Sequence, residues 1–293
     1  MLPFEQFEPS HGHLLAIDSD GCAFDSMNRK HREAFLPAWT EVFQLPVSAE
    51  AAREVWDFVN LFGATRGVNR FQALVLAFDH LREHPATAAP ERLPSAAPLT
   101  DWIRLTDSLS EKSLLAAIES GDNHPLLRSA LEWTREVDRR VAALPPPEPF
   151  PGVRETLAAC GGRADRVVVS QAPSATLHRE WTHAGLAEET ETIAGQEYGS
   201  KAAQVRRARK HASAAHAASV LLIGDAPADQ QAAAGAGVRF FPILPGGESA
   251  SWQRLRDEAL PRFFSDRYDD AYECGLCHEF NRALPATPPW TSA

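Results

Sequence analysis

Four short apolar runs constrain the fold of this 293-residue chain more than any other feature. Each run is bounded by polar or turn residues; the runs are Leu14–Ile17, Val167–Val169, Val220–Ile223 and Phe240–Ile243. Runs of this length, rich in β-branched residues, are typical of strands buried in a parallel sheet. Two segments of helical character, Ala175–Ala184 and Ala202–His216, lie between the later runs. The alternation predicts a Rossmann-like, doubly wound α/β sheet, to which Thr190–Ala194 would add a short strand.

A long helical stretch, 28–144, interrupts this pattern after the first run. Its segments of helical period are His31–Val42, Ala49–Leu61, Arg70–Leu81 and Leu126–Ala143, with a loop expected at 85–98. The proline-rich segment 144–152 cannot continue a helix and predicts a stiff return to the sheet. We therefore expect an α/β core from 1–27 and 145–265, an inserted α-helical domain at 28–144, and a C-terminal tail at 266–293 of unassigned role.

Composition excludes several classes of function. The 39 acidic and 29 basic residues give a net charge of −10, which argues against a general nucleic-acid-binding surface. No apolar run approaches the roughly 20 residues that span a bilayer. The acidic N-terminus predicts no secretory signal, and four cysteines are too few for a disulfide framework. We expect a cytoplasmic protein without a nucleic-acid or membrane partner; the oligomeric state stays open.

Carboxylates follow two of the expected strands directly. Asp18 and Asp20 come after the first run, and Asp225 and Asp229 come after the third. Because the carboxyl ends of parallel strands meet at one edge of a sheet, these acids should lie close together. Such clustering is costly unless a cation offsets it, and hard oxygen ligands suit Mg²⁺. The sequence therefore predicts a magnesium site at this edge.

Other polar residues fall at the same edge. Ser170 and Gln171 follow the second run, and Gly21 would let the backbone pass close to an anion. Lys201 is one of only four lysines and opens the helix before the third run. A lysine at a helix start opposes the helix dipole, which indicates another use for its charge.

These motifs, in order, resemble those of the haloacid dehalogenase (HAD)-like hydrolase superfamily, in its phosphatase and phosphoglucomutase-like branch. The matching residues are Asp18-Ser-Asp20-Gly21-Cys-Ala-Phe-Asp25-Ser26, Ser170, Lys201 and Gly224-Asp225-x-x-x-Asp229. Phe150-Pro151-Gly152-Val153 resembles the family's re-entry into the core, and the helical insertion resembles its α-helical cap. Cys22 and Gln171 depart from the residues usual at their positions, and alanines rather than a proline follow Lys201.

The resemblance implies a role for each residue. Asp18 would be the nucleophile that becomes an aspartyl phosphate, and Asp20 would be the general acid and then the base. Mg²⁺ would be held by the Asp18 carboxylate, the Asp20 carbonyl oxygen and Asp225, with Asp229 in support. The phosphoryl oxygens would be bound by Ser170, Gln171, Lys201 and the backbone at Gly21.

The expected function is Mg²⁺-dependent hydrolysis of a small phosphorylated metabolite. A phosphomutase of the β-phosphoglucomutase type would carry the same motifs, and a non-catalytic ligand-binding protein on this fold is the alternative from another class. A dehalogenase is disfavoured because that branch lacks the acid at the position of Asp20. The substrate is not specified by these residues.

Two further motifs stand outside the core pattern. Arg66, Asn69 and Arg70, in the expected cap, could read an anionic group of the substrate, although a solvated loop is an equal alternative. Cys274-Gly-Leu-Cys277-His278 matches a haem-attachment pattern, but haem attachment needs export. Idle or structural thiols are favoured over a redox pair, and a zinc half-site would lack its second half.

Overall fold

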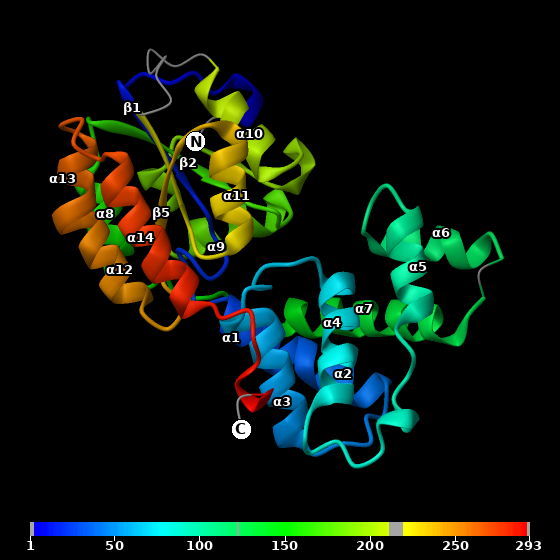
Figure 1. Cartoon of the computed structure of the whole chain (residues 1–293). Coiled ribbons are helices and arrows are strands. Elements are labelled where there is room, and N and C mark those ends of the chain that lie inside the picture. Colours follow the sequence, from blue (N-terminus) through cyan, green and yellow to red (C-terminus); the bar gives the residue numbers. More distant parts are fainter. Residues whose placement is uncertain (1–2, 122, 211–218, 292–293) are drawn as a thin grey trace. The chain divides into compact units, whose positions relative to one another are not determined.

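The computed structural model describes residues 3–121, 123–210 and 219–291. It divides into two compact units: 1–27 with 146–283, and 28–145 with 284–293. Figure 1 shows the sheet in the first unit and helices alone in the second. No helix among the described residues is long and apolar enough to cross a membrane.

The first unit is built on a five-stranded parallel sheet of order β3-β2-β1-β4-β5. Its strands are β1 (His13–Ile17), β2 (Ala164–Val169), β3 (Thr192–Ala194), β4 (Val220–Gly224) and β5 (Arg239–Pro242). The chain fills one side of β1 with β2 and β3 and then crosses to the other side with β4 and β5. The strand order therefore reverses between β1 and β4, and ligands of such sheets bind beyond the strand ends at this point.

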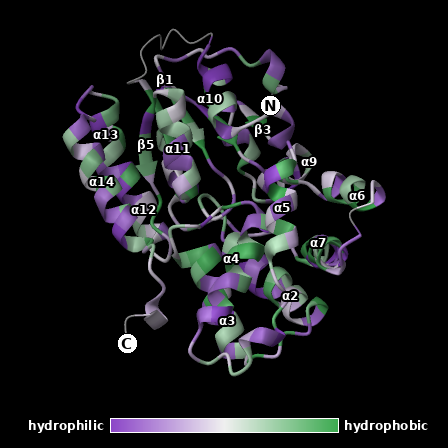
Figure 2. Cartoon of the chain, turned by 45° about the vertical axis from the view of Figure 1, so that its right-hand side comes forward, coloured by the Kyte–Doolittle hydropathy of each residue, from purple (hydrophilic) through white to green (hydrophobic). Residues whose placement is uncertain are grey.

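Helices cover both faces of the sheet, which confirms the doubly wound α/β fold predicted from the apolar runs. Leu15 and Ile17 of β1 face a core shared with α8 (Val153–Ala159), α9 (Ser174–His183) and α12 (Glu248–Arg254). On the other face, α10 (Lys201–Arg209) contacts β2, and α11 (Pro227–Ala236) contacts β4 and β5. Figure 2 colours α10 mostly hydrophilic, as expected of a helix with one side in water. Residues 211–216, in the expected helix Ala202–His216, lie outside the described residues.

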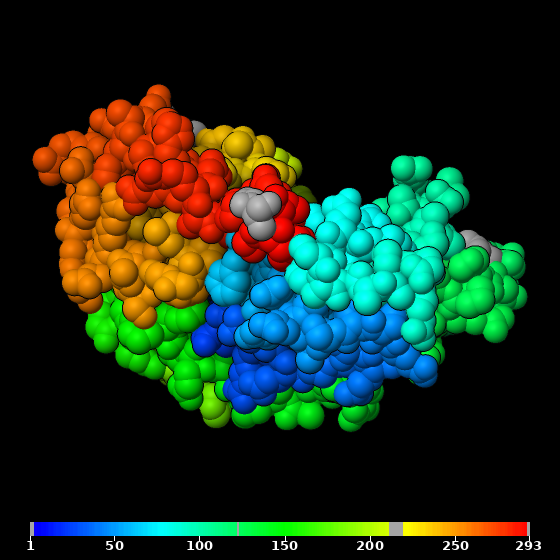
Figure 3. All heavy atoms as spheres, turned by 60° about the horizontal axis from the view of Figure 1, so that its bottom comes forward, coloured from blue at the N-terminus to red at the C-terminus, as the bar shows by residue number. Residues whose placement is uncertain are grey.

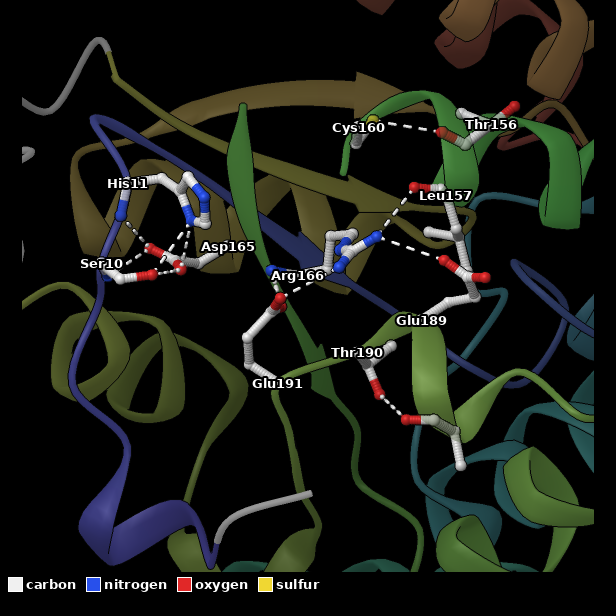
Figure 4. A network of polar contacts seen from close by, with 11 residues as sticks. Ser10, His11, Thr156, Leu157, Cys160, Asp165, Arg166, Glu189, Thr190 and Glu191 are labelled. Atoms are coloured by element: carbon white, nitrogen blue, oxygen red, sulfur yellow. Dashed lines mark hydrogen bonds and ion pairs between the residues drawn. The ribbon is translucent and has the colours of Figure 1, made fainter. Parts of the chain in front are cut away.

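The opposite end of the sheet is fastened by a buried carboxylate. Asp165 of β2 accepts hydrogen bonds from the backbone N–H groups of Ser10 and His11, at 2.9 and 3.0 Å, and from the Ser10 hydroxyl. Next to it, Arg166 forms ion pairs with Glu189 and Glu191 (Figure 4). These contacts hold the segment before β1 and the turn before β3 against β2, and so help to set the register of the strands that carry the site.

The second unit is helical over its described residues. Its elements are η2 (His31–Phe35), α2 (Leu36–Val42), α3 (Ala49–Asp57), η3 (Phe58–Phe62), α4 (Arg70–Glu83), η4 (Pro90–Arg92), α5 (Ala97–Leu105), α6 (Glu111–Glu119) and α7 (Pro125–Ala143), after the short α1 (Met27–Lys30). Tryptophans 39, 56 and 133 pack at its centre. Helices α5 and α6 were not anticipated from the sequence, and α5 begins inside the loop expected at 85–98.

The C-terminal residues divide between the units, where the sequence left one unassigned tail at 266–293. After η8 (Leu255–Ala259) and α13 (Leu260–Phe263), helix α14 (Asp270–Ala283) packs beside β5 and belongs to the first unit. Residues 284–291 belong to the second unit and end in the short helix η9 (Pro289–Thr291). In this segment, the Trp290 ring contacts the rings of Phe58, His80 and His84. Figure 3 shows these red residues against the surface of 50–85. The apolar pattern of the C-terminal residues is interrupted at Pro261 and at η8, so their helices could not be predicted from the sequence.

Candidate active site

The site is built where β1 and β4 end, side by side. Ile17 pairs with Ile223, and the next residue, Asp18, donates its backbone N–H to the Ile223 carbonyl at 2.9 Å. This bond holds Asp18 in line with β1 and beside the turn that carries Asp225. Both carboxylates are buried, with 6% of Asp18 and 1% of Asp225 exposed.

Asp229 joins this pair from the first turn of α11. Carboxylate oxygens of Asp18, Asp225 and Asp229 lie within 4.8 Å of one another. The Oδ2 atom of Asp229 accepts the N–H groups of Asp225 and Ala226, each at 3.0 Å. A Cβ atom on Gly224 would meet the Asp229 side chain at 2.5 Å, so only glycine fits at the end of β4. The Gly-Asp-x-x-x-Asp spacing thus folds the second acid back onto the turn.

Lys201 enters the cluster from the N-terminus of α10. Its Nζ lies 2.8 Å from Asp18 Oδ1 and also contacts Asp229 Oδ1. Both oxygens of Asp229 are therefore engaged, one by backbone N–H groups and one by the ammonium. In this arrangement Asp229 orients Lys201 and fixes the turn, whereas Asp18 and Asp225 lie beside it at the ends of β1 and β4.

The electrostatics of the cluster follow from burial. Burial opposes the charged form of Lys201, but Asp18 and Asp229 outweigh it and raise the pKa of the ammonium above its usual value. Burial also raises the pKa of Asp18; Lys201 opposes this shift, and Asp229 and Asp225 add to it. Among the described residues, three carboxylates crowd around this ammonium and repel one another, and a bound cation would offset that repulsion.

Asp20 lies on the loop that follows β1 and is held by its own neighbours. Gly21, at φ 79°, turns the loop, and its N–H donates to Phe24 O at 2.9 Å. The Ser26 hydroxyl donates to Asp20 Oδ1. Ser26, six residues after Asp20, was not predicted from the sequence to be a functional residue. This contact orients a carboxyl group that is only partly buried.

Two buried tryptophan rings hold the loop that follows β1 by hydrogen bonds. Trp181 Nε1 donates to the Ser19 hydroxyl at 3.0 Å, and Trp252 Nε1 donates to Cys22 O at 2.8 Å. Cys22 is fully buried; burial first, and then the cluster acids, raises the pKa of its thiol. A neutral, enclosed thiol here contributes packing.

Ser170 and Gln171 follow β2 at the same edge of the sheet. The buried Ser170 Oγ accepts a hydrogen bond from Ala172 N at 3.1 Å, and its hydroxyl hydrogen can be donated elsewhere. The amide nitrogen of Gln171 donates to Gly199 O at 3.1 Å and, more weakly, to Ser170 O at 3.4 Å. The Gln171 side chain thus ties the loop after β2 to the loop before α10.

The three polar residues of the second unit have partners inside that unit. Asn69 caps α4 by accepting from Phe71 N at 3.0 Å, and it donates to Leu109 O. Arg70 pairs with Asp138 at 2.8 Å and lies over the Phe35 ring. Arg66 is 2% exposed and donates to Leu61 O at 2.8 Å. A fully solvated loop therefore does not describe Arg66.

Comparison with known proteins gives structural matches only. No family model matches the sequence, and no curated protein matches it. A haloacid dehalogenase-like family hydrolase from Streptococcus pneumoniae is 13% identical over 84% of this chain and 91% of its own, with a TM-score of 0.47. A haloacid dehalogenase-like family hydrolase from Xanthomonas campestris is 15% identical over 89% of this chain and 99% of its own, with a TM-score of 0.44. A predicted phosphoglycolate phosphatase from Haemophilus somnus is 17% identical over 80% of this chain and 85% of its own, with a TM-score of 0.49. Because these identities are low, the activity of this chain has to be inferred from its own side chains and not from these proteins.

Proposed function

We propose that this protein is a Mg²⁺-dependent phosphohydrolase that cleaves a small phosphorylated metabolite through a phosphorylated Asp18. The observation that carries the proposal is the buried contact of the Asp18 carboxylate with the Lys201 ammonium, 2.8 Å apart, beside Asp225. A nucleophilic carboxylate, a fixed cation and further oxygen donors at one strand-end crevice are the groups that phosphoryl transfer needs.

The residues present fit a magnesium ion. Asp18 and Asp225 offer buried carboxylate oxygens, and the Asp20 backbone carbonyl lies on the loop that follows Asp18. All of these donors are hard oxygens, which suit Mg²⁺. The crowding of three carboxylates is further support, because a divalent cation would offset the repulsion between them and favour the charged form of Asp18. When bound, Mg²⁺ would neutralise charge on the transferring phosphoryl oxygens.

Asp18 is the group placed to attack phosphorus. Its backbone is fixed to β4 and its carboxylate is held by Lys201, so little reorganisation is needed when a phosphate ester arrives. An Asp18 oxygen bonds to phosphorus as the ester oxygen leaves. Water then attacks phosphorus, releases inorganic phosphate and restores the carboxylate, which divides one difficult displacement into two easier ones.

Asp20 and the oxygen-binding groups complete this scheme. Asp20, oriented by Ser26, gives a proton to the leaving oxygen and later takes one from the attacking water. Lys201 and the Ser170 hydroxyl stabilise the phosphoryl oxygens from the protein side. Asp229 acts through Lys201 and the turn after β4, as its two engaged oxygens indicate.

A panel of phosphorylated metabolites, assayed for phosphate release with Mg²⁺, tests the function and ranks substrates. We expect release without a bisphosphate activator, and none from an equal amount of the Asp18→Asn variant. Isomerisation that depends on a bisphosphate, with little phosphate released, would point to a phosphomutase instead. A folded protein that binds these metabolites without turning over any of them would favour the non-catalytic alternative.

A further inference from the structure

The Cys-x-x-Cys-His motif lies on one continuous helix that the proposed function does not use. Cys274, Cys277 and His278 occupy α14, and positions separated by three and four residues share a helix face. Cys274 and His278 are exposed, Cys277 is half-buried, and neither thiol is in a disulfide. Figure 3 shows the orange-red residues of this region at the surface of the first unit. The motif therefore presents one thiol and an imidazole together, with the second thiol, Cys277, hydrogen-bonded to Gln230 beside them.

The spacing of two of these side chains matches a metal-binding pair. Cys274 Sγ and His278 Nε2 are 3.8 Å apart. With metal–sulfur and metal–nitrogen bonds of about 2.3 and 2.0–2.1 Å at a tetrahedral angle, zinc ligands lie about 3.6 Å apart. Only a small adjustment of two exposed side chains would bring both to bonding distance of one ion.

The same helix disfavours a redox pair. Residues three apart on a helix have Cβ atoms about 5–6 Å apart. A disulfide needs a Cβ separation of about 3.5–4.5 Å, so Cys274 and Cys277 could form one only if α14 unwound locally. A metal ion adds two bonds between the sulfurs and spans the wider gap without breaking the helix.

The neighbouring carboxylates are committed elsewhere, which defines the donor set. Glu273 pairs with Arg239 at 2.8 Å and accepts from Phe240 N. Glu279 pairs with Arg254 at 2.7 Å. Sulfur and imidazole nitrogen thus remain as donors, in contrast to the all-oxygen cluster around Asp18. Such donors select zinc and other thiophilic ions over Mg²⁺.

We propose that Cys274 and His278, joined by Cys277 once its side chain turns from Gln230 toward them, form a surface site for a single thiophilic divalent cation of the Zn²⁺ class, with solvent in the fourth position. On binding, each thiol gives its proton to solvent as its metal–sulfur bond forms. The site is separate from the Asp18 cluster, so it does not depend on the proposed hydrolase activity.

Cobalt titration of the full, reduced chain tests this proposal directly. Excess Mg²⁺ in the buffer would occupy the oxygen cluster, and a thiolate-to-cobalt charge-transfer band would report sulfur ligation. The other two cysteines should stay silent: Cys22 is fully buried, and burial raises the pKa of the Cys160 thiol to about 11. We expect a band that saturates at one Co²⁺ per chain and disappears when Zn²⁺ is added.

Substitutions then assign the ligands. Cys274→Ser and His278→Ala should each weaken Co²⁺ binding by at least about tenfold, since even loss of an outer partner costs about 10–100-fold. His178→Ala removes an exposed imidazole from α9 and should leave the titration unchanged. The proposal is overturned if no charge-transfer band forms, or if Cys274→Ser leaves it intact. Conversion of both thiols to a disulfide under mild oxidation, with no Co²⁺ band beforehand, would favour a redox pair.

Discussion

The cluster around Asp18 and the Arg66–Arg70 segment of the second unit both contain charged residues that the sequence singles out, yet the fold treats them differently. At the strand ends, the buried Asp18 and Asp225 carboxylates cluster with Asp229 around the partly buried Lys201 ammonium. In the second unit, Asn69 and Arg70 satisfy a helix terminus and a surface ion pair. Buried carboxylates that crowd against one another indicate chemistry, whereas charged groups that complete local structure do not.

The largest effect should come from Asp18→Asn, which removes the nucleophile at the centre of the first region. We expect phosphate release to fall by about 10⁴-fold or more, since loss of a nucleophile has costs of this order. The near-identical amide should keep the fold, so the thermal midpoint should change little. Substantial residual turnover in a correctly folded Asp18→Asn protein would remove the distinction between the two regions.

Removal of the metal should have a comparable effect on the same region. Excess chelator should abolish phosphate release, and added Mg²⁺ should restore it, because the Asp18 and Asp225 oxygens would otherwise repel the phosphoryl group. The assay is initial rate against free Mg²⁺. Full activity in chelator would show that Lys201 alone can offset the charge of the cluster.

Asp20→Asn should have the next largest effect. A general acid contributes about 10²–10⁴-fold, so the variant should phosphorylate slowly and release phosphate more slowly still. The deficit should shrink for an aryl phosphate, whose leaving group needs less protonation. Ser26→Ala, which removes the hydroxyl that donates to Asp20, should lower kcat far less and serves as the graded control.

Arg66→Ala tests whether any residue of the second region reads the substrate. A charged hydrogen bond to a substrate anion is worth roughly 1.5–3 kcal/mol, or about 10- to 150-fold in kcat/KM. We expect a loss of this size for Arg66→Ala with the best substrate and a much smaller loss for a small aryl phosphate, whereas Arg70→Ala, which removes a surface ion pair, should change kcat/KM little. Equal losses on both substrates would instead identify Arg66 as structural.

The smallest effect should come from Asn69→Ala. Its side chain caps α4, and loss of such a cap costs about 1 kcal/mol of stability. Denaturant unfolding should report this loss, while kcat/KM of the folded variant should stay at the wild-type value. A selective loss of kcat/KM without a loss of stability would move Asn69 from the structural to the substrate-reading group.

The strand ends could be predicted because a parallel sheet collects them at one edge. Once the apolar runs were assigned to strands, Asp18 and Asp225 were expected at one edge of the sheet, and the position of Lys201 at a helix start indicated another use for its charge. The two-sided role of Asp229 could not be predicted, because it depends on how closely the turn after Gly224 folds back.

The second unit and the C-terminus were harder to predict for a related reason. Helical periodicity locates helices but not the partners of their polar residues, so it could not show that Arg66 is buried or that Asn69 is a cap. Helix α14 was missed because only its residues Leu276 and Phe280 are buried, and Phe280 packs on Phe240 of β5. These elements are set by tertiary packing rather than by local pattern.

Chemical trapping of the phosphorylated enzyme tests the central claim most directly. The protein is mixed with its best substrate and Mg²⁺, quenched rapidly, and reduced with borohydride, which converts an aspartyl phosphate to homoserine. Peptide mass spectrometry should locate homoserine at position 18, with none in the Asp18→Asn variant. Rapid phosphate release without modification at position 18, or with modification at another acid, would contradict the mechanism.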